Sequence, residues 1–508
     1  MKKFNRALVS VSNKSGLGEF IKQLHSEGTE IVSTGGTAKY LRDQGVEVQD
    51  VSSVTGFPEV MNGRVKTLHP KIHMGLLARA GHQGDEQTLN EFEVEMFDLV
   101  VGNLYPFEEV LKNKSASEED KIENIDIGGP SFLRSAAKNF TRITTICDPN
   151  DYEKVLQSEK MSLDQNKALA AKVFSHTSVY DSMISKSLGI DFDNIEFSVG
   201  GKNKSQLRYG ENPSQKATWF QMSGAVNGLH EANLLQGKAL SYNNLLDLDA
   251  AVTTLREFSS EPSCVSVKHL NPCGVGLGNN TTEAIEHSLK ADPKSVFGGI
   301  VAVNGQVDEF GAEKLCALFL ECVIATSFTD QAKEKFKAKK NLRVLEWPEI
   351  LNADPSFKFK NIDGGFLVQN EDQTEVWSPS WKIIGEEPSD AVKKSIALAW
   401  KVCAHLKSNA IAISSDVHTL GLGMGQVNRV DAVEQAISRY EGFHPEANNI
   451  VLASDAFFPF ADSIERIAKS GVKWVVQPGG SIKDDEVLAA AKKLNITLIL
   501  TGKRHFNH

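Results

Sequence analysis

Two successive strand-to-helix transitions near the start of the chain constrain its fold more than any other feature. Ala7 to Val11 and Glu30 to Ser33 are short apolar segments typical of buried strands, and apolar residues at helical spacing follow each of them. The turn Thr34-Gly35-Gly36-Thr37 separates the second strand from its helix, which runs through Leu41. Strand, glycine turn and helix in this succession predict a doubly wound sheet of parallel strands.

The ends of these two strands carry groups that suit an anion. Ser10, Ser12 and Lys14 follow the first strand, and the hydroxyls and glycines of residues 34–37 follow the second. Strand ends of a parallel sheet meet at one rim, where the N–H groups of a helix N-terminus can hold a phosphate. An ordinary glycine turn with a threonine cap is the alternative, and one such turn alone would not decide between them.

Further along, two polar segments interrupt the apolar pattern. Gly63-Arg64-Val65-Lys66-Thr67-Leu68-His69-Pro70 is too basic for a core, so we expect an exposed loop in which Pro70 stops any helix. The strand Asp98 to Leu104 delivers Tyr105, and the turn Asp126 to Pro130 opens a helix that carries Arg134 and Lys138. Taken singly, Asp126 would be a helix cap and Lys138 a solvated charge.

A second concentration of polar chemistry follows the apolar strand Cys264 to Val267. Lys268 and His269 stand side by side at its end, and we expect Asn271, Pro272 and Gly274 to force an immediate turn. A cation and an imidazole at a strand end are candidate site residues. A surface lysine and a turn-capping histidine are the alternative, and this stretch by itself leaves both open.

The same stretch superficially resembles a zinc deaminase site, His269-Leu-Asn-Pro-Cys273. Such a site needs His-x-Glu for proton transfer and Pro-Cys-x-x-Cys to complete the metal ligands. Here Asn271 replaces the glutamate and Gly276 stands where the second cysteine should be. Two plausible ligands do not make a zinc site, so we expect no catalytic metal.

The chain has 508 residues, which predicts two to four domains. The polar run Ser198 to Ser205 is typical of a linker, and we place the boundary near Gly200, giving domains of residues 1–199 and 200–508. Within the second domain, residues 265–278 and 404–425 look similar, since Lys407 and Asn409 accompany another apolar strand, although no residue-by-residue repeat is detectable.

Composition narrows the class of partner. The 55 basic and 65 acidic residues give a net charge of -10, which argues against nucleic acid as the main partner. No apolar run approaches a membrane span, and the first residues lack the apolar core of a signal peptide. We therefore expect a soluble, cytoplasmic protein. Its six scattered cysteines predict reduced core thiols, with no disulfide and no structural zinc.

Sequence motifs of this chain occur together, and in the same order, in a known protein family. The chain resembles the bifunctional purine-biosynthesis family, in which aminoimidazole carboxamide ribonucleotide (AICAR) formyltransferase is joined to IMP cyclohydrolase. The resemblance covers nearly the whole chain and rests on the Lys268-His269 pair and on further motifs: Gly63–Pro70, Asp126–Gly129, Leu207–Pro213, Ser408–Ala410, Ser454–Phe460 and Arg504–His508.

The resemblance implies a fold and two reactions. The N-terminal domain would be doubly wound and methylglyoxal-synthase-like, and the C-terminal transformylase domain would consist of two cytidine-deaminase-like α/β subdomains. The second domain would move a formyl group from the cosubstrate 10-formyltetrahydrofolate to AICAR. The first would close formyl-AICAR to IMP with loss of water. The family also implies a homodimer with transformylase sites at the subunit interface.

The resemblance assigns roles to residues of this chain. For ring closure it implies Lys66, Tyr105, Asp126 and Lys138 as catalytic residues, with substrate contacts at Ser10, Ser12, Lys14, Thr34, Gly35, Gly36, Thr37, Arg64 and Thr67. For formyl transfer it implies His269 as the base, Lys268 as oxyanion partner or acid, and Asn409 to orient the formyl group. The remaining substrate contacts would be Arg208, Tyr209, Asn244, Phe297, Gly298, Gln426, Phe457, Asp462 and Arg504.

Chemistry of the residue types fits these roles. The AICAR amine is conjugated and weakly nucleophilic, so a base in contact is needed, and histidine as a residue type titrates near ~6.5. A nucleotide-sensing protein without catalysis is a further alternative, and the intact Lys66, Asp126 and Lys268 argue against it. Gln426 is followed by Val427-Asn428-Arg429, where many relatives carry a different pair before the arginine, so its role has weaker support.

Overall fold

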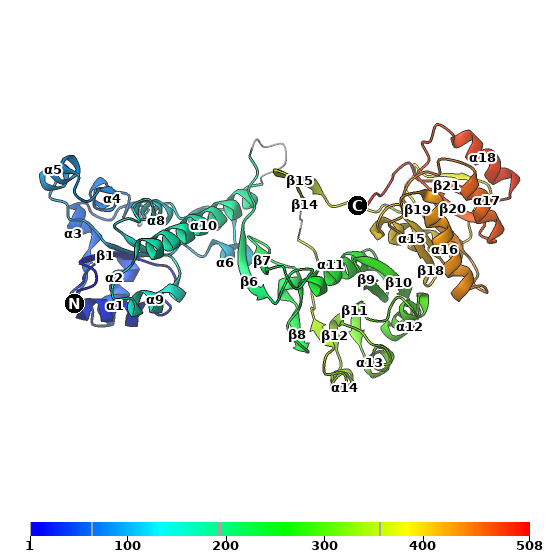
Figure 1. Cartoon of the computed structure of the whole chain (residues 1–508), viewed down its shortest axis with the longest axis horizontal. Helices are drawn as coiled ribbons and strands as arrows, with labels where there is room; N and C mark the ends of the chain where they lie inside the picture. The colour runs from blue at the N-terminus through cyan, green and yellow to red at the C-terminus, as the bar shows by residue number, and fades with distance from the viewer. Residues whose placement is uncertain (1, 62–63, 190–195, 355–356) are drawn as a thin grey trace. The chain divides into compact units, whose positions relative to one another are not determined.

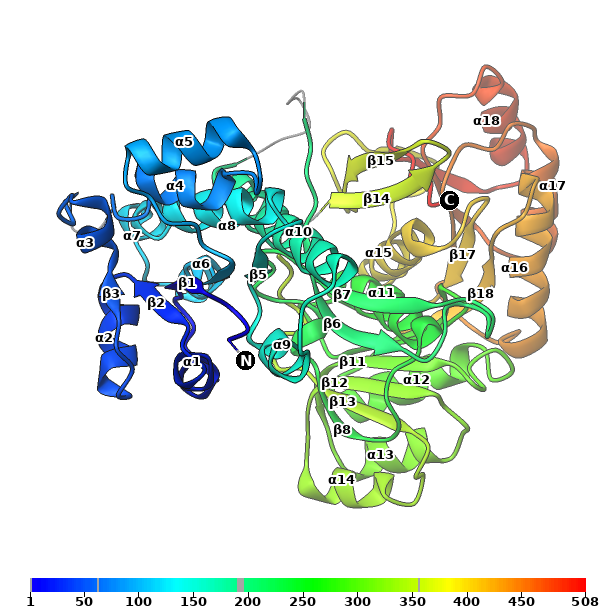
Figure 2. The same cartoon turned by 60° about the vertical axis from the view of Figure 1, so that its left-hand side comes forward.

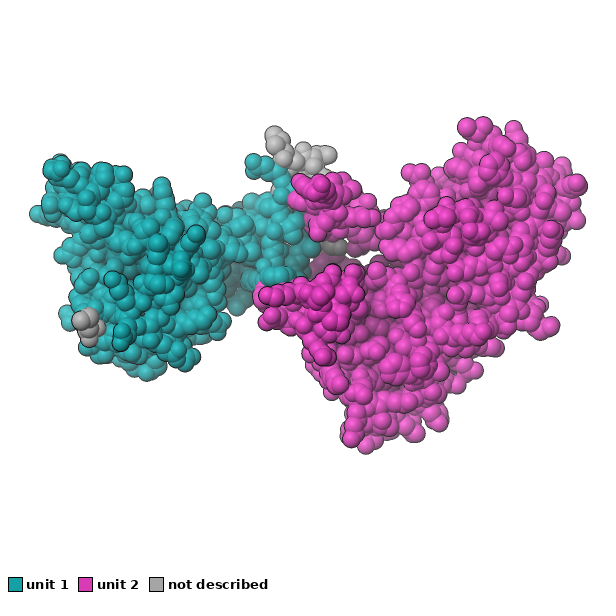
Figure 3. Space-filling view, in the orientation of Figure 1, with its two compact units in different colours: residues 1–202, 220–226 teal, residues 203–219, 227–508 magenta. Residues whose placement is uncertain are grey.

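The computed structural model describes residues 2–61, 64–189, 196–354 and 357–508. The chain divides into two compact units, unit 1 of residues 1–202 and 220–226 and unit 2 of residues 203–219 and 227–508 (Figure 3). The chain leaves unit 1 in the first strand and returns to it in the second strand of a hairpin formed by β6 (Gly201–Leu207) and β7 (Ala217–Met222). The expected linker Ser198 to Ser205 is therefore wrong from Gly201 onward, because pairing with β7 makes that part a strand.

Unit 1 contains a five-stranded parallel sheet in the order β3-β2-β1-β4-β5. Figure 1 labels its central strand β1, and Figure 2 labels β1, β2, β3 and β5. Its strands are β1 (Arg6–Ser10), β2 (Glu30–Ser33), β3 (Gln49–Asp50), β4 (Leu99–Gly102) and β5 (Thr144–Ile146). Its helices are α1 (Leu17–Ser26), α2 (Gly35–Asp43), α3 (Val51–Thr55), α4 (Pro70–Leu77), α5 (Gln83–Glu91), α6 (Phe107–Lys112), α7 (Glu118–Glu123), α8 (Gly128–Lys138), α9 (Tyr152–Gln157) and α10 (Leu163–Ser187).

Both faces of this sheet are buried. Leu8 and Val100 point into one apolar cluster, while their neighbours Ala7, Val9 and Leu99 point into another. Successive strand residues face opposite sides, so a sheet covered on both faces needs continuous apolar strands, which is the pattern that the sequence contains. The predicted doubly wound domain is confirmed.

One local expectation in unit 1 is wrong. Pro70 does not stop a helix but occupies the first position of α4, and the His69 ring caps it by accepting the Lys71 N–H at 3.2 Å. Proline suits this position because its missing N–H has no intrahelical acceptor there. The preceding loop is only partly exposed, since Thr67 is buried.

Unit 2 contains two six-stranded sheets with the same topology, in the orders β10-β9-β11-β12-β13-β8 and β18-β17-β19-β20-β21-β16 (Figure 2). The first half consists of β8 (Asn233–Gln236), α11 (Tyr242–Arg256), β9 (Ser263–Lys268), β10 (Asn271–Leu277), α12 (Thr281–Ala291), β11 (Ile300–Val307), α13 (Glu309–Cys316), β12 (Cys322–Phe328), α14 (Asp330–Phe336) and β13 (Arg343–Glu346).

The second half repeats this order as β16 (Lys382–Ile384), α15 (Asp390–His405), β17 (Ile411–Ser414), β18 (Thr419–Gly423), α16 (Arg429–Phe443), β19 (Val451–Ser454), α17 (Asp462–Lys469), β20 (Trp474–Gln477), α18 (Asp484–Lys493) and β21 (Thr497–Leu500). A hairpin of β14 (Phe357–Ile362) and β15 (Gly365–Asn370) lies between the halves in sequence. The expected pair of related α/β subdomains is confirmed.

Glycines explain why the repeat shows in structure and hardly in sequence. A Cβ on Gly276 of β10 would overlap the backbone of α12 at Ser288, and a Cβ on Gly423 of β18 would overlap α16 at Ala432. Each hairpin therefore needs glycine for close helix packing, whereas most other positions need only apolar residues. No helix in the described parts of the chain combines the length and the apolar character needed to span a membrane.

The turn after β9 differs from the expectation. Asn271, Pro272 and Gly274 belong to strand β10, and the turn consists of His269 and Leu270, with φ of 54° and 65°. Antiparallel pairing of Asn271 with Lys268 leaves a two-residue loop, and such loops need left-handed conformations at both central residues. Strand pairing has overridden the local turn preferences of Asn, Pro and Gly.

Candidate active sites

A cavity of about 570 Å³ opens at the rim of the unit 1 sheet. It joins β1, β2 and β4 ends with the loop before α4 and the N-terminus of α8. Most of the predicted residues of this unit line it: Ser10, Ser12, Lys14, Thr34, Gly36, Thr37, Arg64, Lys66, Thr67, Tyr105 and Asp126. The volume lies within the range of small-molecule sites.

One side of the cavity is built to receive an anion. The Ser10 and Thr34 hydroxyls lie 2.9 Å apart, and the Thr37 hydroxyl donates to the Val11 carbonyl at 3.0 Å. Helix α2 begins at Gly35 without a side-chain cap at Thr34, and a Cβ on Gly36 would meet nothing. The start of α2 and Lys14 thus line the same side of the cavity, which suits a phosphate.

Lys66 and Thr67 lie on another side of this cavity. The Lys66 ammonium pairs with the Glu59 carboxylate at 2.9 Å. The Thr67 hydroxyl lies next to Gly128, where a Cβ would come within 3.0 Å of it. Gly128 is the first residue of α8, so a cation, a hydroxyl and the start of a helix converge where negative charge could develop on a substrate.

Asp126 precedes α8 and is the half-buried acid of the cavity. Its Oδ1 accepts the Gly129 N–H at 2.8 Å, and a Cβ on Gly129 would collide with the carboxyl group. Burial raises the pKa of Asp126, and the N–H groups of Gly129 and Tyr105 and the charge of Lys66 oppose that rise. A raised pKa makes the carboxylate a stronger base, which suits a group that takes and returns a proton.

Three predicted residues of unit 1 lie elsewhere or are not described. Gly35 lines an adjoining cavity of about 30 Å³ together with Glu59 and Lys66. Lys138 is exposed in the last turn of α8, at the opposite end from Gly128, and does not line the large cavity. Gly63, the first residue of the basic motif, lies outside the described residues.

Two cavity residues with polar or charged side chains, Asn103 and Glu123, were missed by the sequence analysis. The Asn103 carboxamide accepts the N–H groups of Ser12 and Asn13 at 2.7 Å and 2.9 Å, and so fixes the loop after β1. Glu123 forms an ion pair with Arg64 at the cavity wall. The only signal for Asn103 was its place at the end of β4, because its partners lie some 90 residues earlier.

In unit 2 the tip of the β9–β10 hairpin holds Lys268 and His269. The Lys268 ammonium donates to the Phe297 carbonyl at 2.6 Å, and His269 is exposed. Both residues line a cavity of about 140 Å³ between the two halves, together with the ion pair of Asp292 and Arg439. A histidine held at positive φ is uncommon, and such backbone conformations cluster at functional sites.

The hairpin tip is joined to the segment that carries Asn409. The Asn271 carboxamide donates to the His269 carbonyl at 3.0 Å and accepts the Lys407 N–H at 3.0 Å. The structure thus brings the lysine–histidine pair and the second-half segment together through one side chain. The Cys273 thiol donates to the Ser266 carbonyl at 3.4 Å inside the sheet.

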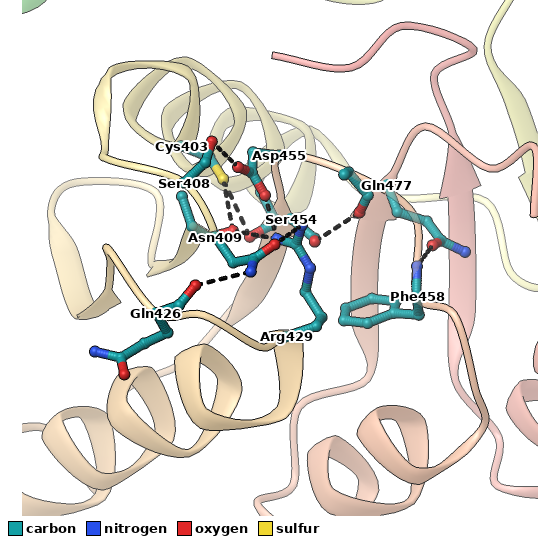
Figure 4. Close-up of polar contacts among 12 residues, drawn as sticks. Cys403, Ser408, Asn409, Gln426, Arg429, Ser454, Asp455, Phe458 and Gln477 are labelled. Atoms are coloured by element: carbon teal, nitrogen blue, oxygen red, sulfur yellow. Dashed lines mark hydrogen bonds and ion pairs between the residues drawn. The ribbon is translucent and has the colours of Figure 1, made fainter. Parts of the chain in front are cut away.

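Asn409 is held at both ends of its amide (Figure 4). Its Oδ1 accepts the Arg429 guanidinium at 2.7 Å, and its Nδ2 donates to the Gln426 carbonyl at 2.8 Å. Arg429 also pairs with Asp455, and the two side chains are only 6% and 0% exposed. The Ser408 hydroxyl donates to the second Asp455 oxygen at 2.6 Å. The buried Asp455 carboxylate therefore holds both Arg429 and Ser408, which flank the Asn409 side chain.

Other predicted contacts in unit 2 are more dispersed. Asn244 is buried at the start of α11, where its Oδ1 accepts the Ser241 N–H at 3.1 Å in a capping box. The Gln426 side chain donates to the Met424 carbonyl at 3.2 Å, and Gly298 follows the carbonyl that Lys268 contacts. Exposed or half-exposed positions are held by Arg208, Tyr209, Phe297, Phe457, Asp462 and Arg504.

A doubly wound unit with a nucleotide-sized, anion-binding cavity, followed by a duplicated α/β unit with its own lysine–histidine turn, defines a two-part enzyme acting on a phosphorylated substrate. Comparison with known proteins agrees. The family model described as MGS-like domain matches residues 16–131, and the one described as AICARFT/IMPCHase bienzyme matches residues 136–439.

Curated relatives match over almost the full length. The "Bifunctional purine biosynthesis protein PurH" of Caldicellulosiruptor saccharolyticus is 46% identical over 522 aligned positions, covering 99% of each chain. The protein of the same name from Bacillus cytotoxicus is 46% identical over 513 positions, again covering 99% of each chain. The chain belongs to the AICARFT/IMPCHase bienzyme family, and it is a bifunctional AICAR formyltransferase and IMP cyclohydrolase of purine biosynthesis.

Proposed function

We propose that ring closure takes place in the unit 1 cavity and formyl transfer around Lys268 and His269 of unit 2, with 10-formyltetrahydrofolate as formyl donor. The observation that carries the assignment is the convergence of the anion-binding rim, Lys66, Thr67 and Asp126 on one cavity of about 570 Å³. The functional domains would then be residues 1–199 and 200–508, close to the limits of the two compact units.

In ring closure, the carboxamide nitrogen of formyl-AICAR forms a bond to the formyl carbon, and the former formyl oxygen leaves as water. The nucleotide phosphate lies at the N-terminus of α2 beside Lys14. Negative charge on the formyl oxygen is stabilised by Lys66 and Thr67, which requires Lys66 to leave Glu59. Asp126, whose pKa is raised by burial, takes the proton of the attacking nitrogen. Tyr105 lies beside Asp126. Lys138 does not line this cavity, and its catalytic role is a prediction that rests on the family resemblance alone.

In formyl transfer, the AICAR amine attacks the formyl carbon and the folate nitrogen leaves. His269, exposed at the hairpin tip, takes the amine proton, and Lys268 stabilises the oxyanion or protonates the leaving nitrogen. A guanidinium has only donors, so Arg429 must face the carbonyl oxygen of Asn409. Asn409 therefore offers its second Nδ2 hydrogen to the substrate, and acts as a donor to the formyl oxygen.

Arg208, Tyr209 and Arg504 would hold the nucleotide, with Phe457 against the folate. Asn244, Phe297, Gly298, Gln426 and Asp462 complete the proposed contacts. Several of these side chains are exposed in a single chain, Phe297 by 56% and Phe457 by 40%. That exposure supports a homodimer in which a second copy covers the transformylase site. We further propose that the enzyme works in the cytoplasm.

The test is an ultraviolet assay of the full chain with AICAR and 10-formyltetrahydrofolate, with and without a metal chelator. IMP should form at the same rate in both cases. The His269→Ala variant should lose formyl transfer by ~10²–10⁴ while closing supplied formyl-AICAR at the wild-type rate, because a general base contributes about that much. Near wild-type transfer by this variant would remove His269 from the mechanism, and loss of IMP with chelator would favour a metal enzyme.

A further inference from the structure

One side chain of helix α10 contacts the loop that precedes α8, next to the ring-closure cavity. Tyr180 lies 4% exposed on α10, far along the chain from the loop that precedes α8. Its hydroxyl accepts the Asp126 N–H at 2.9 Å and donates to the Asn124 carbonyl at 3.1 Å. One phenol thus holds the backbone on both sides of Ile125, including the N–H of the half-buried Asp126.

Both hydrogen bonds require a protonated phenol. Burial raises the pKa of Tyr180 to about 12, so the hydroxyl keeps its proton at neutral pH and can donate and accept at the same time. The ring itself packs edge-on against Phe107, with centroids 6.2 Å apart. A phenylalanine would keep that packing, so the oxygen has a role separate from filling the core.

The Asp126 carboxylate is held from the opposite direction. Its Oδ1 accepts the Gly129 N–H from the first turn of α8, while Tyr180 holds its backbone from α10. The two helices pack against one another, so the acid is fixed between two rigid elements rather than by its loop alone. If the backbone anchor is lost, the loop can shift while the helices stay in position.

We infer that Tyr180 is a positioning residue for ring closure, whose hydroxyl fixes the Asn124–Asp126 backbone and thereby the direction in which Asp126 presents its carboxylate to the substrate. The inference rests on the proposed role of Asp126 and extends it to a residue outside the cavity lining. Tyr180 does not touch substrate, so its removal should change the rate of the chemical step and leave substrate binding intact.

Two measurable consequences follow for Tyr180→Phe in the full chain. A displacement of about 1 Å at a reacting group can cost ~10² in rate, so kcat for closing supplied formyl-AICAR should fall by about 10-fold to 100-fold, with KM changed less than about twofold. A freer loop admits water to Asp126. Its pKa, raised by burial, should then move down, and the acid limb of the kcat profile should move to lower pH with it.

The groups that face Asp126 and could shift that limb themselves are Lys66, Tyr105 and Tyr180. The matched control is Tyr152→Phe, because Tyr152 is also a buried phenol of unit 1, 6% exposed and stacked on Phe20, but lies away from the cavity. It should keep the wild-type kcat and pH profile. Formyl transfer, measured on each preparation, should stay unchanged and reports intact protein.

An unchanged kcat and pH profile in Tyr180→Phe overturns the inference, as does a raised KM at constant kcat, or an equal loss in Tyr152→Phe. Asp126→Asn, assayed in parallel, separates this failure from that of the proposed function. If Asp126→Asn still closes the ring, the role of Asp126 itself is wrong. If it does not, and Tyr180→Phe is normal, only the positioning role is wrong.

Discussion

The buried ion pair beside Asn409 allows stability and catalysis to be separated by mutation. Arg429 and Asp455 are 6% and 0% exposed, and Arg429 also donates to Asn409 at 2.7 Å and to the Ala410 carbonyl at 3.2 Å. Removing one partner of such a pair leaves an uncompensated buried charge, so Arg429→Met should cost ~3–5 kcal/mol in unfolding free energy.

Neutralising both partners should restore most of that stability. In Arg429→Met/Asp455→Asn no lone charge remains, and the amide can still accept the Ser408 hydroxyl, which now lies 2.6 Å from the carboxylate. We expect the double variant to unfold within about 1 kcal/mol of the wild type, since exchanging a buried pair for neutral groups is often close to neutral. Formyl transfer should nevertheless stay at least ~10-fold slow, because the Asn409 amide has lost the donor that orients it.

The assay combines urea unfolding with formyl transfer and ring closure on the same preparations. Ring closure should be unaffected in all variants. Arg256→Met is the matched control, because this half-buried guanidinium of unit 2 donates to the Ile350 and Asn352 carbonyls at 2.9 Å and 3.1 Å without touching Asn409. It should lose stability and keep the transfer rate. Recovery of both stability and transfer in the double variant would refute the orienting role of Arg429.

Two other predictions concern coupling and acid stability. Lys66→Ala should keep formyl transfer but stall net conversion of AICAR early. Mixing it with full-length His269→Ala should restore IMP formation. If Lys66→Ala does not stall, ring closure does not drive formyl transfer forward. The His418 imidazole is 7% exposed, and burial lowers its pKa to about 4. Its contribution to the free energy of unfolding is therefore complete above the pKa of ~6.5 that the unfolded chain has, and it is lost as pH falls from there toward 4. Between pH 7 and pH 5 this group should remove about 2 kcal/mol of unfolding free energy, and His418→Phe should lose correspondingly less in urea titrations. The titratable groups that face it are His287, His444 and Lys290.

Local signals predicted which residues meet at the rim of the unit 1 sheet. The hydroxyls and glycines of residues 34–37 directly follow β2 and open α2, so their neighbours in sequence are also their neighbours in space. The same holds for Asp126 and the start of α8. Where a site is made from one strand end and the helix that follows it, periodicity and glycine placement are sufficient.

Long-range pairing explains what the sequence could not predict. The turn at His269 and Leu270 contradicts local preference, and it exists because β9 pairs with β10 and Asp247 accepts the Leu270 N–H at 2.7 Å. Asn244 completes the capping box of α11 by accepting the Ser241 N–H, a local role that many asparagines share. Tyr180 contacts residues more than 50 positions earlier, and nothing in the spacing of α10 distinguishes it from other core positions.

The chemistry of the two reactions explains why one chain carries both. Formylation of a conjugated amine by a reactive folate should be close to balanced, whereas ring closure creates an aromatic purine and should run nearly to completion. The second reaction then draws the first forward by mass action, which requires only that both sites share a pool of formyl-AICAR. Each unit has its own apolar clusters and, as proposed, its own catalytic groups, so each should act on free intermediate. Complementation between Lys66→Ala and His269→Ala tests this directly, because both proteins are full length and neither can complete the sequence alone. If the mixture converts AICAR no further than Lys66→Ala does by itself, although each variant keeps its remaining activity, the intermediate does not pass through solution and transfer within one molecule must carry the coupling.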